Sequence, residues 1–359
     1  MAIQYLAGNR VQGTSTERTS STLLGNPPQW VELTRYEVTS ATKTWNTAEF
    51  DKYPYLMLLW DCKVDQTNAD PAFRFNNDSG NNYRALTQWG NGSSDSDSNT
   101  QNYLRITGGN DNEQIFCYMN FANPTGTKVA SRIGHGIVTQ EKHGSNNYPY
   151  TAQHAMRWNG TEQINQVYAD NVQSSGSRQW KTGSELVVLG FDPNGGATKS
   201  SFWQQLGTFT GSTPSGTIAS KKYIFFDAWL KGVSSGDSGK FQVGVDSLDS
   251  GSNYNVTYDS NGAGNTGETS AKTGSEPLTV TTPIYYRGYI LNKAGDTKIC
   301  IMNGTRLNSA GVSNYPSRWE ESWTYTANKS SQINRFGGVP HGSGAALDSS
   351  SYVRVWGAD

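Results

Sequence analysis

The sequence has few charges and few of the residues that build helical enzymes. Charged residues make up 16% of the chain and hydrophobic residues 34%, and 39 glycines together with many Ser, Thr and Asn fill the difference. No long run of Leu, Ala, Glu and Lys at helical spacing is present, which argues against an α/β enzyme. Aromatic residues reach 12%, whereas disordered chains are poor in them. The composition predicts short strands joined by polar turns around aromatic cores.

Net charge and long apolar segments are also missing. The formal net charge is −1, so no overall field attracts nucleic acid or an acidic membrane surface. No stretch of 18 apolar residues occurs, which argues against a transmembrane helix. The opening "MAIQYLAGNRVQG" has no basic region leading into an apolar run. We therefore expect no secretion signal, synthesis in a cytoplasm, and neither nucleic acid nor membrane as a partner.

Cysteine is scarce and widely spaced. Cys62, Cys117 and Cys300 are odd in number, and no C-x-x-C pattern occurs. Neither a zinc site nor a disulfide framework is indicated. We expect all three to be buried packing residues.

Catalytic motifs are missing too. No G-x-S-x-G, phosphate-binding loop or dinucleotide fingerprint is present. Glycoside hydrolysis needs two carboxylates that flank one bond, but the adjacent Glu320 and Glu321 would point to opposite faces of a strand. His135, His143 and His154 are close in sequence but lack a regular metal-ligand spacing. We therefore expect that the chain is not an enzyme and that it holds neither a metal nor a cofactor.

One acidic stretch leaves an alternative open. The segment "DSDSN" at 95–99 imitates the start of a calcium loop. Such a loop needs a Glu at its twelfth position, and Ile106 stands there. We expect a solvated hairpin loop, and a loosely built loop calcium site is the alternative.

The sequence does contain an internal repeat. Order and spacing of the matching segments agree over roughly 160 residues, which predicts two copies of one domain, 29–193 and 202–359, joined by a flexible linker at 194–201. The matching pairs are "QWVELTRY" (29–36) with "FWQQLGTF" (202–209), "SGNNYR" (79–84) with "SGSNYN" (250–255), Gln-Ile-Asn at 163–165 and 332–334, and the endings "GFD" (190–192) and "GAD" (357–359).

Each copy has the pattern of a β-sandwich. About eight short strands with Gly- and Asn-rich loops per copy predict an all-β chain of two tandem, duplicated jelly-roll or β-sandwich domains. Ile164 and Ile333, central in the repeated tripeptides, are expected to point inward from equivalent strands. The apolar run "YPYLMLLW" at 53–60 is expected to be a strand buried on both faces.

Residues 1–28 precede the first copy and end in a double proline, which predicts a stiff joint. We expect an extended N-terminal arm, with Ile3, Tyr5 and Leu6 as its apolar oligomerisation residues. Such a segment can add a strand to the sheet edge of a neighbouring chain. A frayed terminus is the alternative.

Several segments carry a resemblance to a group of viral proteins. The opening "MAIQYLAGNRVQG" resembles the start of tail and appendage proteins of marine tailed phages. "FRFNNDSGNNY", the "YP…W…QIN" segment and "GSELVVLGFDP" are similar to jelly-roll or lectin-like domains of such virion proteins. The second copy departs from the pattern, with "VGVDSLDSGSNY" and "VRVWGAD". The resemblance implies a place in the virion and supplies no catalytic residues.

These observations lead to two function hypotheses. The first is a structural virion protein (a decoration, appendage or tail-fibre component) that self-associates and docks on the particle through its arm, with copies of itself and other virion proteins as partners. The alternative is a lectin-like module for host surface glycans, in which Trp89 and Trp180 stack on sugar rings. A double jelly-roll major capsid protein and an extracellular filament subunit are further alternatives.

Overall fold

The computed structural model describes most of the chain after its first 29 residues. In the described part, β-strands are the only regular elements, which confirms the all-β prediction. The described residues are 30–65, 71–89, 95–106, 114–124, 131–141, 149–172, 179–193, 200–233, 237–260, 266–270, 277–278, 283–307, 316–341 and 345–359.

The first half of the chain contains strands β1 to β12, all within the predicted span 29–193. Their bounds are β1 (Val31–Glu37), β2 (Thr44–Asn46), β3 (Tyr55–Lys63), β4 (Pro71–Phe75), β5 (Tyr83–Trp89), β6 (Asp95–Gln101), β7 (Leu104–Arg105), β8 (Gln114–Ala122), β9 (Arg132–Gln140), β10 (Tyr150–Trp158), β11 (Val167–Asn171) and β12 (Glu185–Phe191).

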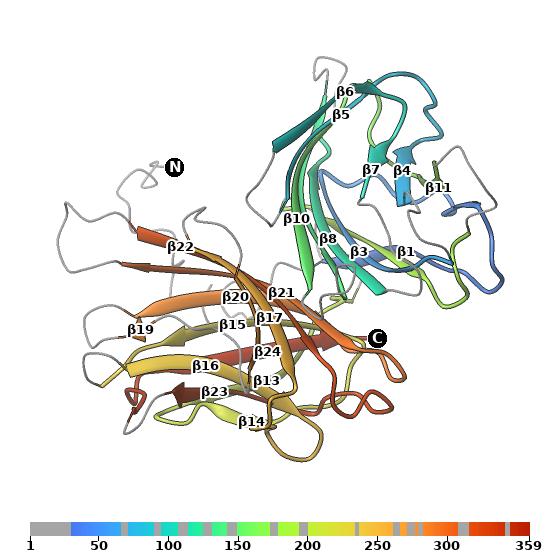
Figure 1. The fold of residues 1–359 in the computed structure, drawn as a ribbon. Coiled ribbons are helices and arrows are strands. Elements are labelled where there is room, and N and C mark those ends of the chain that lie inside the picture. Colours follow the sequence, from blue (N-terminus) through green and yellow to red (C-terminus); the bar gives the residue numbers. More distant parts are fainter. Residues whose placement is uncertain are drawn as a thin grey trace, which may run out of the picture.

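Strand pairing makes this half a jelly roll with one enlarged sheet (Figure 1). The large sheet has the order β1-β12-β3-β8-β9-β10-β5-β6, and the small sheet has the order β2-β11-β4-β7. The chain alternates between β1-β12-β3-β8 and the small sheet, which is the jelly-roll arrangement. Two hairpins, β5–β6 and β9–β10, extend the large sheet beyond those four strands.

The second half repeats this strand order. Its sheets are β13-β24-β15-β20-β21-β22-β17-β18 and β14-β23-β16-β19, so every strand corresponds to the strand twelve numbers earlier. The shared topology agrees with the predicted repeat, and a gene duplication stays an interpretation of it. The bounds are β13 (Gln204–Thr210), β14 (Ser215–Thr217), β15 (Tyr223–Leu230), β16 (Asp237–Gly244), β17 (Tyr254–Ser260), β18 (Thr266–Ser270), β19 (Pro277–Leu278), β20 (Ile284–Leu291), β21 (Lys298–Leu307), β22 (Pro316–Tyr325), β23 (Arg335–His341) and β24 (Tyr352–Ala358).

The first strand of each half bends at the same position. The pairing of β1 with β12 shifts around Leu33, and the pairing of β13 with β24 shifts around Leu206. A β-bulge of this kind re-aims side chains and increases the twist. Gly190 and Gly357 leave room for the bulged leucines, since a Cβ there would lie 2.8 and 2.7 Å from the respective leucine Cδ1.

The two Gln-Ile-Asn tripeptides mark a second shared device, although they lie in loops before β11 and β23 and not inside strands as predicted. Ile164 and Ile333 are fully buried, as expected. Their N–H groups donate to Asn123 Oδ1 (2.7 Å) and Asn292 Oδ1 (2.8 Å), and each Asn Nδ2 donates back to the isoleucine carbonyl at 3.1 Å. These asparagine clamps anchor equivalent loops in both halves.

Aromatic side chains fill the interior of the first half. Trp60 and Trp180 are fully buried there and stack with ring centroids 5.4 Å apart. Cys62, Cys117 and Cys300 are buried and free, which confirms their expected packing role.

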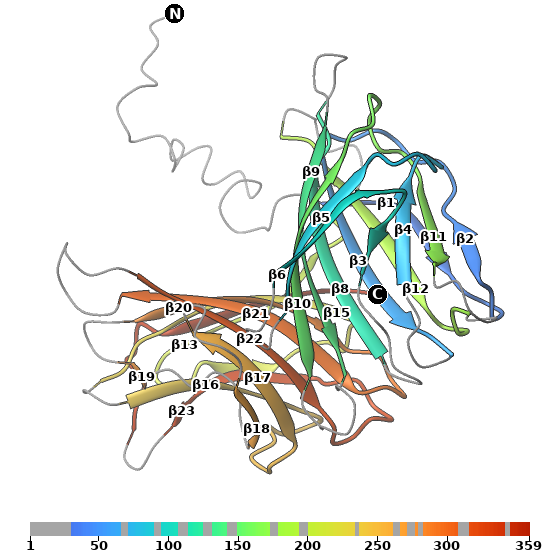
Figure 2. The ribbon, with the colours of Figure 1, turned by 45° about the horizontal axis from the view of Figure 1, so that its top comes forward.

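The outer faces of the two large sheets pack against each other and form the junction between the halves (Figures 1 and 2). The Phe202 N–H also donates to the Trp30 carbonyl at 2.7 Å, which links the starts of β1 and β13. Burying this apolar surface from both halves is the main stabilising contribution at the junction. Its buried apolar residues are Trp30, Met57, Leu59, Phe116, Ile137, Val187, Leu189, Trp203, Tyr223, Phe225, Tyr289, Leu291, Ile299, Ile301, Trp356 and Ala358.

The junction is offset, because the halves use different parts of their equivalent faces. When the halves are aligned on the Asn123 and Asn292 clamps and on strand pairing, several junction residues of the first half correspond to residues outside the apolar junction cluster of the second, most of them polar or charged. These pairs are Leu59 with Asp227, Phe116 with Tyr285, Ile137 with Asn303 and Val187 with Arg354.

Ion pairs between the halves add to this apolar contact. Asp61 is fully buried and Glu185 nearly so, and each faces a lysine of the other half. A buried carboxylate needs such a partner to offset the loss of hydration. The pairs are Asp61–Lys293 at 2.9 Å, Glu185–Lys222 at 2.8 Å and Lys63–Asp296 at 2.5 Å.

Candidate ligand pocket beside the junction

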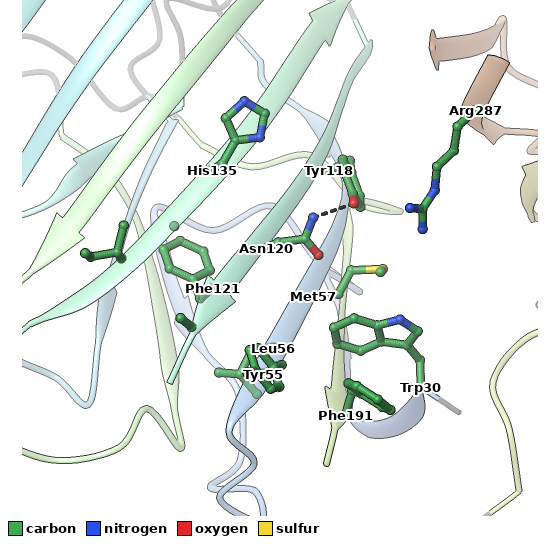
Figure 3. A pocket seen from close by; sticks show the side chains of 13 residues that line it. Trp30, Tyr55, Leu56, Met57, Tyr118, Asn120, Phe121, His135, Phe191 and Arg287 are labelled. Atoms are coloured by element: carbon green, nitrogen blue, oxygen red, sulfur yellow. Dashed lines mark hydrogen bonds between the residues drawn. The ribbon is translucent and has the colours of Figure 1, made fainter. Parts of the chain in front are cut away.

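A pocket of about 510 Å³ opens where the junction ends on the first half (Figure 3). Its floor is the outer face of strands β12, β3, β8 and β9, and Arg287 reaches in from β20 of the second half. Small-molecule sites in proteins have this size and often lie between domains. The pocket is therefore a candidate ligand site.

Strand alternation explains which side chains reach the pocket. Successive residues of a strand point to opposite faces, so Tyr118 and Asn120 of β8 share the outer face, and His135 lies opposite Asn120 on β9. On β3, Tyr55 lies on that face and is 45% exposed. The expectation that 53–60 is a strand buried on both faces is therefore wrong at its start. Tyr53 and Pro54 precede β3 and are half-buried, and the offset junction does not cover Tyr55.

One wall of the pocket is aromatic. The Phe191 ring lies 5.6 Å from the Trp30 ring and 6.1 Å from the Tyr55 ring, centroid to centroid. Figure 3 shows Trp30 and Phe191 beside each other at this end of the cavity. Trp30 is buried behind this wall, whereas Phe191 is half-buried and Tyr55 is exposed. Exposed aromatic faces can pack against the C–H face of a sugar or against another flat apolar group.

The opposite side of the pocket is polar. Asn120 Nδ2 donates to the Tyr118 hydroxyl, and the Tyr118 ring stacks on Tyr289 with centroids 4.0 Å apart. Arg287 Nη2 donates to the Tyr289 hydroxyl at 3.4 Å. The guanidinium points toward this cluster in Figure 3. The pocket thus offers hydrogen-bonding groups across from an aromatic wall.

Charge in the pocket is positive or neutral. Its lining residues include no Asp or Glu. Burial and the charge of Arg318 lower the pKa of His135 below its ordinary value, so its imidazole is neutral at pH 7. The two ring nitrogens then present one donor and one acceptor.

The tryptophans singled out from the sequence do not line this pocket. Trp180 is fully buried between Trp45 and Trp60, so the prediction that it stacks on a sugar is wrong. A tryptophan in a Gly/Ser-rich segment can still close a sandwich core, and here it does. Trp89 ends β5 and pairs with Ala152, but its side chain lies outside the described part, so its role stays a prediction.

The sequence also singled out the N-terminal arm and the acidic 95–99 segment. Ile3, Tyr5 and Leu6, with the whole arm 1–28, lie outside the described residues. The 95–99 segment belongs to strand β6 and pairs with β5, so the expected loop is wrong and with it the geometry of a calcium loop. Within the described residues no group of three His, Cys, Asp or Glu is placed to hold a metal ion.

The sequence does not identify the pocket residues, because they are distributed over separate segments of the chain. Tyr55, Tyr118, Asn120 and His135 come from three strands, and only the pairing of those strands brings them together. The one available hint was alternation, since polar residues recur at every second position in "CYMNFA". Arg287 alternates in the same way with Tyr285 and Tyr289, whereas His135 stands alone in "IGHG".

Comparison with known proteins adds no relative. No protein-family model matches the chain, and a search of curated protein sequences finds no match. The resemblance to marine phage virion proteins therefore depends on the sequence segments alone. Among the described residues, no helix has the length and apolarity required to cross a membrane.

Proposed function

We propose that this protein is a carbohydrate-binding, lectin-like β-sandwich protein that holds a sugar in the pocket beside the junction. The observation that carries the proposal is the pairing of the Trp30–Phe191–Tyr55 wall with the polar Asn120 and His135 in one cavity. The aromatic wall packs on the C–H face of the ring, and the polar groups bond its hydroxyls.

Recognition without cleavage fits this set of side chains. Glycoside hydrolysis uses two carboxylates about 5–10 Å apart around the scissile bond. The residues that line the pocket include no carboxylate, so the pocket itself offers no acid–base pair. The proposal is accordingly a binding role.

The test is a glycan array read with the wild-type protein and with Tyr55→Ala. Tyr55 is 45% exposed, so its truncation should leave the fold intact while weakening sugar binding about tenfold through the lost stacking contact. Tyr285→Ala is the matched control, because Tyr285 is 38% exposed and does not line the pocket. No binding by the folded wild-type protein, or equal binding by both variants, would contradict the proposal.

A structural role in a virion is the second candidate, and the two roles are compatible in a receptor-binding appendage. It is supported by the resemblance of the opening segment and by a junction that already joins two jelly rolls through sheet faces. Deleting residues 2–25 should then abolish self-association, measured by light scattering and electron microscopy. Normal assembly of the truncated protein would contradict docking through the arm.

A further inference from the structure

We infer that the pocket selects sugars that carry a carboxylate, and that Arg287 binds this carboxylate. This inference rests on the proposed function, because it specifies the sugar that the same pocket would hold. It concerns the charged end of the cavity, which the aromatic wall does not explain.

Arg287 differs from the other junction cations in its surroundings. Its guanidinium lies over the Phe225 ring, 4.9 Å from the centroid, and its hydrogen bond goes to the neutral Tyr289 hydroxyl. Among the described residues no ion pair joins it to a carboxylate. The other cations at the junction are paired: Lys293 with Asp61 at 2.9 Å, Lys222 with Glu185 at 2.8 Å and Arg35 with Glu185 at 3.0 Å.

A guanidinium held in this way suits a carboxylate ligand. Arg presents a planar fork that binds a carboxylate through two parallel hydrogen bonds. Stacking on Phe225 and bonding to Tyr289 limit the freedom of the side chain before a ligand arrives, so less entropy is lost on binding. Because no Asp or Glu lines the pocket, an entering anion meets no like charge there.

The second half does not offer an equivalent site. On the alignment of the two halves, Tyr289 stands where the first half has Asn120, and Ile301 stands where it has His135. Both residues are buried in the junction. Among the described residues, the second half therefore has no equivalent of this pocket, and one sugar acid should bind at this site per chain.

The experiment is calorimetric titration of the full chain with a matched pair of ligands, methyl glucuronide and methyl glucoside, which differ in the carboxylate. The wild-type protein should bind the glucuronide about tenfold more tightly, with one site per chain, because a charge-assisted bidentate contact is added. Arg287→Gln should remove this preference, because it weakens glucuronide binding about tenfold through the lost charged contact. Arg84→Gln, at an exposed arginine of β5 outside the pocket, is the control and should keep the preference.

The possible failures are distinguishable. Equal binding of both sugars by the wild-type protein, still weakened by Tyr55→Ala, overturns the selection of acids and leaves the proposed function standing. A glucuronide preference that survives in Arg287→Gln overturns the role of Arg287. If neither sugar binds to protein whose circular dichroism shows a folded state, both this inference and the proposed function fail for this pair, and a glycan array without hits completes that result.

Discussion

His154 shows how one side chain ties the stability of the first sandwich to pH. It is 2% exposed on β10, and the Thr87 hydroxyl lies 3.0 Å from its Nδ1. Burial, with a smaller effect of the nearby His135, lowers the pKa of His154 to about 4. The side chain is therefore a neutral packing residue in the folded protein, and a metal or catalytic role has no support from its surroundings.

The pKa of His154 predicts a specific pH dependence. The unfolded chain, with the ordinary His pKa of about 6.5, binds more protons than the folded chain between pH 6.5 and 4. Stability should therefore fall as pH decreases through this window, by about 2 kcal/mol between pH 7 and pH 5. Urea unfolding at both pH values measures the effect, and His154→Gln should show a smaller decrease. Identical decreases for both proteins would show that His154 does not carry it.

At the scale of elements, the asparagine clamps predict that the two halves lose similar stability when the clamp residue is replaced. Asn123 and Asn292 are fully buried, and each holds an isoleucine of the following loop through two hydrogen bonds. Asn123→Ala and Asn292→Ala should each destabilise the protein by about 2–4 kcal/mol, since buried backbone groups lose their partners. Chemical denaturation followed by tryptophan fluorescence measures this. Asn46→Ala, at an exposed residue, is the control and should change stability by less than about 0.5 kcal/mol.

Repeated turns explain why the repeat was readable from the sequence. Asp78 accepts from the Gly80 N–H at 2.9 Å and from Asn82 Nδ2, and Asp249 accepts in the same way from Gly251 and Asn253. These turns need particular residues at particular positions, which explains why "DSGNN" and "DSGSN" are alike. The all-β class and the inward isoleucines were predictable for the same reason: local geometry fixes local sequence.

The pocket and the junction were not predictable in that way. Met57, Phe225 and Trp356 point away from the cores of their own sandwiches and are buried by the other half. Sequence alternation shows that a face is apolar, but it does not show what covers the face. For the same reason the sequence does not show that Trp180 closes a core and does not contact solvent. In both cases the burial of a side chain depends on packing between segments that are distant in the sequence, and not on which residues form strands.

At the scale of the whole molecule, Glu185 connects the two halves. Its carboxylate accepts from the Tyr223 hydroxyl at 2.7 Å and pairs with Lys222 and Arg35. Burial acts to raise the pKa of Glu185, but the bonds from Lys222 and Tyr223 and the charge of Arg35 outweigh it, so the pKa lies below the ordinary value. The carboxylate is thus ionised at neutral pH.

Removing this charge should weaken the junction. Glu185→Gln is expected to destabilise the protein by about 3 kcal/mol at pH 7, because two cations lose a buried partner. Since the folded pKa is lowered, the contribution is present above the unfolded pKa and is lost as pH falls through the folded pKa. The difference between wild type and variant in urea unfolding should therefore shrink below pH 4. Asp359→Asn, which removes an exposed partner of Lys221, should change stability by at most about 1 kcal/mol.

The offset of the junction also determines how far this mode of packing can extend. A contact between unlike patches can in principle be repeated without limit, with each new unit adding to the last. Here the patch that would receive a third sandwich carries Asp227 and Arg354, joined in a bidentate ion pair, in place of Leu59 and Val187. This charged pair disfavours the addition of a third sandwich through the same contact.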